Sequence, residues 1–340
     1  MKKITQKKKR IMGYQAHRVN SKESPVKNIK QCMLFLLFLI TWYSSCLTVV
    51  SGEEIKSRAA VAMDAATGRV LYAKNPEHFL MPASTTKLMT ALVVIENARL
   101  SDVVTISRKA AKTPPTKVGL REGDRVTIET LLHATLIKSA NDAAVALAEA
   151  VAGTEEEFVN LMNRKAVEIG AENTRFINAN GLPGEGQHIT AYDLAKIMRV
   201  AIQSPVLKEI LNKRVTEVST QSGRTVLITN TNKLLWHDED IVGGKTGYTR
   251  QARHCFVCVG ARENETIIVA VLGAPSRGLL WKESENLMAF GSKVMEQQEE
   301  PVVYLTKAGY DSAKATHASY TKKTKKITKR SRRIARRQRI

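Results

Sequence analysis

The sequence predicts an α+β fold in which a helical region is inserted between two groups of strands. Near the start of the body, two apolar stretches flank Ala66-Thr67-Gly68, a pattern typical of a β-hairpin. Helical spacing of apolar residues then dominates until about residue 202. Three apolar strand-like segments and an amphipathic helix follow. Strands and helices that are grouped in this way are typical of the α+β class.

Each element follows from local sequence. The first helix is predicted from about Ser84 to Asn97, where apolar residues recur at helical spacing. Thr190 followed by Asp193 predicts a capped helix that runs to Ile202. The other predicted helices are 128–137, 143–151, 158–169 and 282–297, the predicted strands are 59–64, 69–73, 215–228, 241–249, 254–261 and 266–273, and loops are predicted at 119–126 and 176–188.

A serine and a lysine lie three residues apart at the start of the first predicted helix. Positions i and i+3 share one helix face, which would place Ser84 and Lys87 about 5–6 Å apart. A serine hydroxyl becomes an effective nucleophile when a neighbouring base takes its proton, and a buried lysine that is held neutral can be that base. The helix N-terminus also supplies N–H groups suited to an oxyanion. The alternative is that Ser84 only caps the helix.

A second polar group, Ser139-Ala140-Asn141, lies in the predicted loop between two helices. Asparagine carries both an acceptor and donors, so Asn141 is a candidate to hold a substrate amide. Ser139 is a candidate to pass a proton to a leaving amine. The alternative is that Ser139 and Asn141 only cap the following helix.

A third group, Lys245-Thr246-Gly247, lies in the strand-like segment 241–249. A lysine and a threonine on a strand edge can hold a carboxylate, and a glycine lets a ligand approach the backbone closely. The alternative is an ordinary turn followed by an edge strand.

The net charge of +21 lies almost entirely in the two ends of the chain. Residues 1–53 contain 10 Lys/Arg and 2 Asp/Glu, and residues 301–340 contain 13 and 1. The body between them is nearly neutral, with 30 basic and 29 acidic residues, so it lacks the basic footprint of a nucleic-acid-binding domain. The run 322–339 has 11 basic and no acidic residues, and we expect it to be disordered when unbound and to adsorb to an anionic membrane or envelope surface.

The N-terminal end has the pattern of an export signal. Basic residues up to Lys30 precede the apolar run 33–42, and small residues follow. We expect either cleavage after Ser51 or Gly52, or retention as a signal anchor. Basic residues before the run place the body outside the cytoplasmic membrane. The predicted parts are a leader over 1–52, a folded domain over 53–300 and a basic tail over 301–340.

The cysteines do not indicate a disulfide framework or a metal site. Cys255 and Cys258 form a C-x-x-C in a strand-like segment, where residues three apart point to opposite faces. A zinc site needs further ligands at suitable spacing. We therefore expect two buried thiols and no bound metal.

Taken together, S-x-x-K, S-x-N and K-T-G in this order resemble the motifs of penicillin-binding proteins and serine β-lactamases. Over about residues 58–297 the chain is similar to the low-molecular-mass D-alanyl-D-alanine carboxypeptidases, peptidase family S11. Segments that carry this resemblance include 139–147, 176–178, 181–183 and 244–249. The resemblance implies a β-lactamase/DD-peptidase-like fold, in which an antiparallel sheet is flanked by helices with an inserted helical subdomain, and it makes 53–300 the catalytic domain.

The resemblance also implies a role for each motif. Ser84 would be the acylated nucleophile, Lys87 its general base, and Ser139 a further catalytic residue beside Asn141. The carboxylate of D-Ala-D-Ala would be bound by Lys245 and Thr246 in a substrate-binding group that includes Asn141, Gly247 and Tyr248, with the backbone N–H groups of Ser84 and Tyr248 as oxyanion hole. Peptidoglycan stem peptides would be substrates and β-lactams covalent inhibitors, and no metal or organic cofactor is implied.

Two other functions stay open. A serine β-lactamase usually needs a deacylating glutamate in an E-x-x-L-N motif, and none occurs between Asn141 and Lys245. The second open function is that of a non-enzymatic protein, which would bind polyanions or membranes through its basic ends. The intact motifs and the near-neutral body favour the carboxypeptidase, exported to the periplasm or to the outer face of the cytoplasmic membrane.

Overall fold

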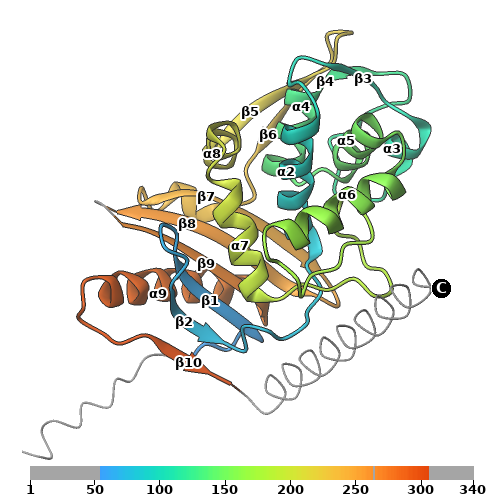
Figure 1. Ribbon diagram of the computed structural model, residues 1–340. Helices are drawn as coiled ribbons and strands as arrows, with labels where there is room; N and C mark the ends of the chain where they lie inside the picture. Colours follow the sequence, from blue (N-terminus) through green and yellow to red (C-terminus); the bar gives the residue numbers. More distant parts are fainter. Residues whose placement is uncertain (1–53, 263–264, 306–340) are drawn as a thin grey trace, which may run out of the picture. The chain divides into compact units, whose positions relative to one another are not determined.

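A computed structural model describes residues 54–262 and 265–305 (Figure 1). The predicted leader and the basic run 322–339 lie outside these described residues. Within the described ranges, no helix combines the length and apolar character needed to cross a membrane.

A six-stranded sheet forms the centre of the fold, in the order β10-β2-β1-β9-β8-β7 (Figure 1). Its neighbouring strands run antiparallel except for β10 and β2, which pair in parallel. The predicted antiparallel sheet is therefore confirmed except at this edge, where β10 extends the fold past residue 300. The strands are β1 Ala59–Asp64, β2 Val70–Lys74, β7 Ile241–Thr249, β8 Arg253–Arg262, β9 Glu265–Ala274 and β10 Val302–Tyr304.

The sheet is buried on both faces, which explains its apolar sequence. All six residues of β1 are buried, and they alternate between two cores. Val61 belongs to the core on the side of the helical region, and Ala62 to the core beneath the last helix. Cys255 and Cys258 divide in the same way, and both are free and buried, as the strand pattern predicted.

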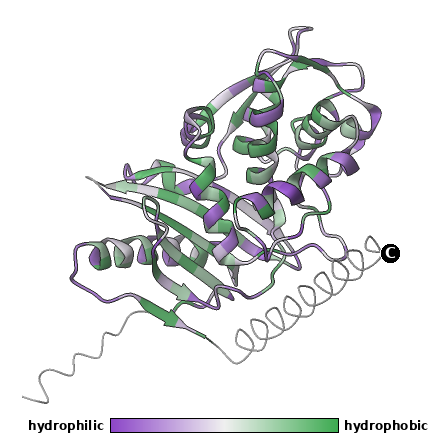
Figure 2. Ribbon diagram, in the orientation of Figure 1, coloured by the Kyte–Doolittle hydropathy of each residue, from purple (hydrophilic) through white to green (hydrophobic). Residues whose placement is uncertain are grey.

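Helices cover both faces of the sheet. The last helix, α9 (Arg277–Met295), packs on β9, β1 and β8, while α7 (Ala191–Ala201) contacts β9 and β1 from the opposite side (Figure 1). The Thr190 hydroxyl caps α7 by accepting from the Asp193 N–H, as predicted. Apolar residues concentrate on the strands and polar residues on the outer turns of the helices (Figure 2).

The helical region stands beside the sheet and carries two small hairpins (Figure 1). Its helices are η1 Ala83–Thr86, α2 Lys87–Asn97, α3 Arg108–Lys112, α4 Ile128–His133, η2 Ala134–Lys138, α5 Asn141–Ala152, α6 Glu155–Glu168, α8 Pro205–Asn212 and η3 Lys233–Trp236. The hairpins pair β3 Val103–Thr105 with β4 Arg125–Thr127, and β5 Val215–Ser219 with β6 Thr225–Thr229.

The short elements α3, β3, β4, η3 and β10 were not predicted. Three further elements also differ from prediction. The helix expected over 128–137 ends as an α-helix at His133 and continues as a π-helical turn, η2. The strand expected over 215–228 is a hairpin, because its centre turns at Gly223, whose φ is +85°. The helix α8 was not predicted, although Ser204 caps it and Pro205 opens it.

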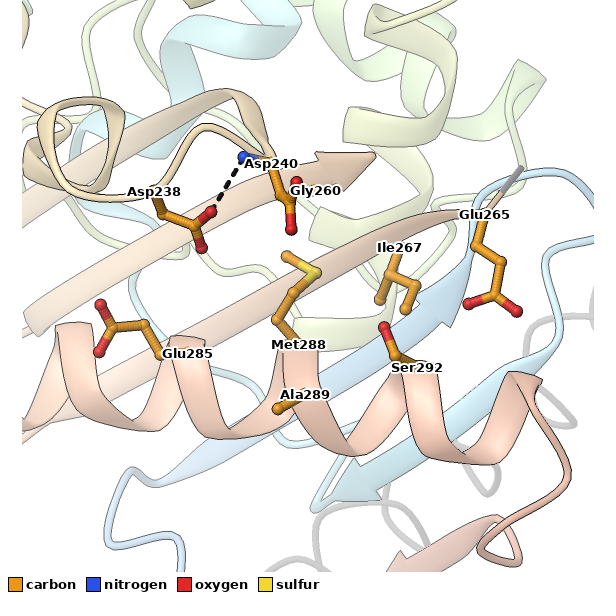
Figure 3. A pocket seen from close by; sticks show the side chains of 9 residues that line it. All are labelled: Asp238, Asp240, Gly260, Glu265, Ile267, Glu285, Met288, Ala289 and Ser292. Atoms are coloured by element: carbon orange, nitrogen blue, oxygen red, sulfur yellow. Dashed lines mark hydrogen bonds between the residues drawn. The ribbon is translucent and has the colours of Figure 1, made fainter. Parts of the chain in front are cut away.

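A cavity of about 120 Å³ lies between the sheet and α9 (Figure 3). Carboxylates of Asp238, Asp240, Glu265 and Glu285 line it together with Met288. It contains none of the eight predicted site residues, so the candidate active site lies elsewhere. Across residues 54–262 and 265–305, no group of three His, Cys, Asp or Glu side chains is placed to hold a metal ion.

Candidate active site

The candidate nucleophile lies on a 3-10 turn immediately before α2. Ser84 is inside η1, whose N-cap is Pro82, and neither η1 nor α2 begins with a side-chain cap. The alternative that Ser84 only caps a helix is therefore wrong. The preceding residue, Ala83, has a φ of +48°. A non-glycine residue in this region costs about 1–3 kcal/mol, and such residues cluster at functional sites.

Two glycines allow other segments to pack directly against this turn. A Cβ on Gly181 would lie 1.9 Å from the Ala83 carbonyl oxygen, and one on Gly247 would lie 2.8 Å from the Ser84 backbone nitrogen. The sequence interpretation assigned Gly247 to the approach of a ligand. In the structure, the turn that carries Ser84 packs against Gly247, which brings β7 alongside the candidate nucleophile.

Lys87 is completely buried beneath Ser84. Its Nζ lies 3.1 Å from Ser84 Oγ, 2.7 Å from Asn141 Oδ1 and 2.5 Å from the carbonyl oxygen of Asn180. Burial, and secondly the charge of Lys245, hold the pKa of the Lys87 amine well below its usual 10.5, while Asp142 opposes this shift.

These three contacts suit a neutral amine. A neutral lysine has two N–H donors and one lone pair, and the two carbonyl-type oxygens of Asn141 and Asn180 accept the two donors. Ser84 Oγ lies 3.1 Å from Nζ, so the lone pair of a neutral Lys87 is within reach of the serine proton. This is the arrangement that a general base needs before it removes a proton.

The second motif follows the π-helical turn. Ser139 ends η2 in the left-handed region, with a φ of +65°. The N-cap of α5 is Ala140, and it has no side-chain cap, so the alternative that Ser139 and Asn141 cap this helix is wrong. Besides its contact with Lys87, Asn141 donates from Nδ2 to the carbonyl oxygen of Pro114 at 3.0 Å, so both ends of its amide contact protein groups.

The third motif lies on β7, an edge strand of the sheet, as the alternative interpretation also expected. Lys245 is fully buried, and burial lowers the pKa of its amine to about 7. Its Nζ donates to Ser139 Oγ at 2.9 Å and to the carbonyl oxygen of Thr246 at 3.0 Å. The exposed ring of Tyr248 packs on His254, with ring centroids 4.6 Å apart.

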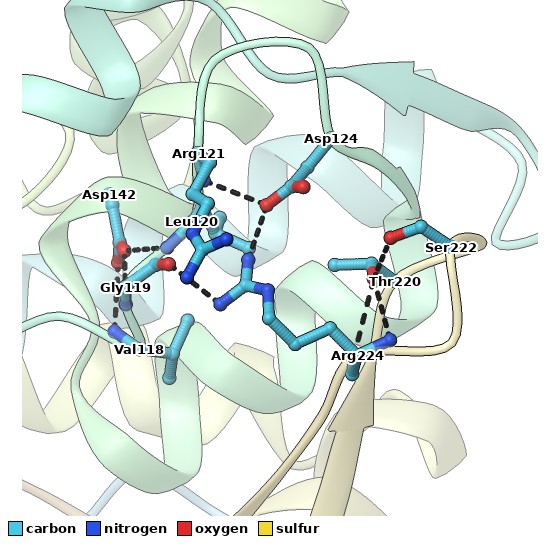
Figure 4. Close-up of polar contacts among 9 residues, drawn as sticks. All are labelled: Val118, Gly119, Leu120, Arg121, Asp124, Asp142, Thr220, Ser222 and Arg224. Carbon is cyan, nitrogen blue, oxygen red and sulfur yellow. Dashed lines mark hydrogen bonds and ion pairs between the residues drawn. The ribbon is translucent and has the colours of Figure 1, made fainter.

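A loop between α3 and β4 borders the second motif (Figure 4). The buried carboxylate of Asp142 accepts the N–H groups of three successive loop residues, Val118, Gly119 and Leu120, at 3.3, 2.9 and 3.0 Å. Arg224, from the turn of the β5–β6 hairpin, donates to the Gly119 carbonyl oxygen at 2.9 Å and pairs with Asp124. These contacts hold the loop where its Pro114 carbonyl meets Asn141.

The structure thus brings the three motifs into one cluster. Ser84, Lys87 and Asn141 are in mutual contact through the Lys87 amine, and Lys245 joins Ser139 to β7. The side chain of Tyr248 makes none of these hydrogen bonds and points to solvent. Sequence reasoning missed three neighbours of the cluster: Asn180, which acts through its backbone carbonyl, Asp142, and Thr231, which contacts Thr246.

The sequence matches the D-alanyl-D-alanine carboxypeptidase family over residues 47–276. The chain belongs to this family. It is 33% identical to the D-alanyl-D-alanine carboxypeptidase DacF of Bacillus subtilis over 259 residues, 73% of this chain and 67% of that protein. It is 35% identical to DacC of Escherichia coli, over 76% of this chain and 67% of that protein.

Solved structures agree with this assignment. A D-alanyl-D-alanine carboxypeptidase from Mycobacterium tuberculosis superposes with a TM-score of 0.69 at 30% identity, covering 72% of this chain and 94% of that one. Membership of the carboxypeptidase family confirms the predicted serine-type D-Ala-D-Ala carboxypeptidase function and its enzyme class. It also confirms the predicted DD-peptidase-like fold.

Proposed function

We propose that this carboxypeptidase removes the terminal D-alanine of peptidoglycan stem peptides through an acyl-enzyme on Ser84. The observation that carries the proposal is the buried Lys87 amine, which has two acceptors for its two N–H groups and the Ser84 hydroxyl 3.1 Å away. Family membership implies stem peptides as substrates and binding of β-lactams.

In the acylation step, Ser84 Oγ attacks the carbonyl carbon of the penultimate D-alanine while its proton passes to Lys87 Nζ. The carbonyl oxygen becomes an oxyanion between the backbone N–H groups of Ser84 and Tyr248. The contact of Gly247 with the Ser84 nitrogen supports this placement, because it brings that part of β7 beside the turn. The role of Asn141 is to orient Lys87 through Oδ1.

In the next step, the C–N bond of the tetrahedral intermediate breaks and the leaving amine takes a proton. Ser139 is placed to deliver it, because its hydroxyl is hydrogen-bonded to the Lys245 amine. With a pKa of about 7, Lys245 exchanges protons readily near neutral pH. Before deacylation, the Lys87 ammonium releases the proton that it took from Ser84 to solvent, and Ser139 regains its own proton through Lys245. Water then attacks the ester carbon while the neutral Lys87 amine takes a proton from it. The ester C–O bond breaks as Lys87 returns this proton to Ser84 Oγ.

The experiment that tests this proposal uses the full-length protein and a synthetic pentapeptide that ends in D-Ala-D-Ala. We expect one equivalent of free D-alanine per peptide, measured with a D-amino-acid oxidase assay. A matched peptide that ends in L-Ala-L-Ala should release no alanine. Absence of D-alanine, or equal release from both peptides, contradicts the proposed activity.

Recognition of the terminal carboxylate is assigned to Lys245 and Thr246. We expect Thr246→Val to lower kcat/KM for a free C-terminal peptide by about 10- to 100-fold, the size of a hydrogen bond to a charged group. The same change should alter the rate on the C-terminally amidated peptide by less than about 3-fold, since that substrate has no carboxylate to lose. Comparable losses on both peptides in steady-state assays would instead assign Thr246 a structural role.

The family acts on the cell wall, and we propose that the leader over 1–52 exports this chain to the outer face of the cytoplasmic membrane or to the periplasm. We further propose that the basic residues of 322–339 hold the enzyme at an anionic surface. The support is their composition, 11 basic and no acidic residues. Each basic residue near an anionic lipid surface contributes about 1 kcal/mol of attraction.

The tail proposal predicts salt-dependent membrane binding. The protein without its leader, residues 53–340, should co-sediment with anionic vesicles at low salt but not with neutral vesicles. The same protein without residues 313–340 should bind neither. Because a Debye length shrinks from about 30 Å at 0.01 M salt to about 8 Å at 0.15 M, binding should weaken steeply across this range. Binding that ignores salt, or that persists in the truncated variant, contradicts the electrostatic proposal.

A further inference from the structure

One contact of the substrate-binding strand involves a residue to which neither the sequence motifs nor the proposed mechanism assigns a role. The hydroxyl of Thr246 donates to the hydroxyl of Thr231 at 2.7 Å. Thr231 lies between β6 and η3, on a different segment from the three motifs. It is partly exposed, as a group that borders a substrate site must be.

Asparagines on both sides hold Thr231 in place. The Asn230 side chain donates to the carbonyl oxygen of Lys213 at 2.9 Å and accepts the N–H of Asn232 at 2.9 Å. Asn232, which is fully buried, accepts the N–H of Leu234 at 3.1 Å. The backbone around Thr231 is therefore fixed by side chains, so its hydroxyl has a defined position relative to β7.

Thr231 also contacts the element that carries the second motif. Its backbone N–H donates to the carbonyl oxygen of Ile137 at 3.2 Å, in the π-helical turn two residues before Ser139. Thr231 thus connects this turn to Thr246 on β7. The Lys245–Ser139 hydrogen bond joins the same two elements from the buried side.

The direction of the threonine–threonine hydrogen bond matters for substrate binding. With Thr246 Oγ1 as the donor to Thr231 Oγ1, its single proton is not available to a substrate. A carboxylate only accepts hydrogen bonds, so Thr246 must turn its proton towards the substrate when one binds. A threonine hydroxyl is both donor and acceptor, which allows Thr231 to donate back to Thr246 Oγ1 in that state. The two hydroxyls then stay hydrogen-bonded, with Thr231 as the donor. This hydrogen bond polarises the Thr246 hydroxyl and strengthens its own hydrogen bond to the anion.

We propose that Thr231 is a positioning residue for carboxylate recognition, and that it reverses its hydrogen bond with Thr246 when a substrate with a free C-terminus binds. This inference rests on the proposed function of Thr246. It predicts that Thr231 acts on the same substrates as Thr246 and only through Thr246.

The test compares three single variants of the full-length enzyme. Thr231→Val keeps the shape of the side chain and removes the hydroxyl, while Thr231→Ser keeps the hydroxyl. Thr229→Val is the matched control, because Thr229 is an exposed threonine two residues earlier, on β6. Melting temperatures of all variants establish that they fold.

We expect Thr231→Val to lower kcat/KM for the peptide that ends in D-Ala-D-Ala by about 10-fold, mostly through KM, and to leave the amidated peptide within about 2-fold. Thr231→Ser and Thr229→Val should both stay within about 2-fold of wild type on both peptides. In a background that already carries Thr246→Val, adding Thr231→Val should cause no further loss, because the two residues act as one unit.

Several results would overturn the inference. These are wild-type kinetics in Thr231→Val, equal losses on the free and amidated peptides, or a full additional loss in the double variant. If Thr231→Val does not fold, Thr231→Ala takes its place. The loss of kcat/KM in Thr231→Ala, relative to Thr231→Ser, on the free and amidated peptides is then judged by the same criteria. A wild-type enzyme that releases no D-alanine refutes the proposed function and this inference together, whereas an active wild type with an unaffected Thr231→Val refutes the inference alone.

Discussion

The variant Ser84→Ala should form no covalent adduct with a labelled penicillin and should release D-alanine at least about 10³-fold more slowly than wild type. The Ser84 hydroxyl is the nucleophile in this account because it is partly exposed and also contacts the buried Lys87 amine. Removing one oxygen leaves the η1 turn and the glycine contacts around it intact, so the variant should fold normally.

The measurement is gel fluorography of the full-length protein after incubation with a fluorescent penicillin. Ser222→Ala is a suitable control, since Ser222 is an exposed serine on the turn of the β5–β6 hairpin. It should label like wild type. Residual labelling of Ser84→Ala at the wild-type level means that another residue is acylated, and the proposed mechanism is then wrong.

The second large effect is expected at Lys87. Both Lys87→Met and Lys87→Arg should lower the acylation rate by about 10²–10⁴-fold, the usual contribution of a general base. Methionine has no basic nitrogen, and arginine stays protonated throughout the accessible pH range. In the wild type, acylation should rise with pH as the Lys87 amine loses its proton, and it should remain fast far below pH 10.5, because burial and Lys245 lower the pKa of Lys87.

The same lowered pKa predicts how stability changes with pH. The unfolded chain keeps Lys87 protonated up to about pH 10.4, whereas the folded chain releases this proton at a lower pH. Between these two pKa values the unfolded state binds more protons, so the folded wild type gains stability as pH rises. Lys87→Met lacks this gain. The unfolding free energy of wild type minus that of Lys87→Met should therefore increase between pH 7 and pH 9.5, as measured by urea denaturation. A constant or falling difference contradicts a buried neutral lysine.

The strands before and after the helical region, and the three motifs, are predictable from sequence because their signals are local. The predicted strand 241–249 has the same bounds as β7. The order of S-x-x-K, S-x-N and K-T-G resembles penicillin-binding proteins and serine β-lactamases, and further segments such as 176–178 and 181–183 indicate the carboxypeptidases among them. The structure places Ser84, Lys87, Ser139, Asn141 and Lys245 in one cluster.

The residues that sequence reasoning missed act through long-range contacts. Asn180 reaches Lys87 with a backbone carbonyl, which every residue has, so its type carries no signal. Thr231 contacts Thr246 because the segment after β6 packs beside β7. Nothing in the polar residues around Thr231 indicates this contact. The contact of Gly247 with the Ser84 turn is equally long-range, since that turn lies more than 160 residues earlier in the chain.

Peptide mapping by mass spectrometry tests the central claim most directly. The full-length protein is incubated with an excess of penicillin, digested, and searched for the adduct mass. The account predicts one adduct per chain, on Ser84, in the peptide that contains Ser84 and Lys87. An adduct on Ser139 or on any other residue, or no adduct while D-alanine is still released, would contradict it.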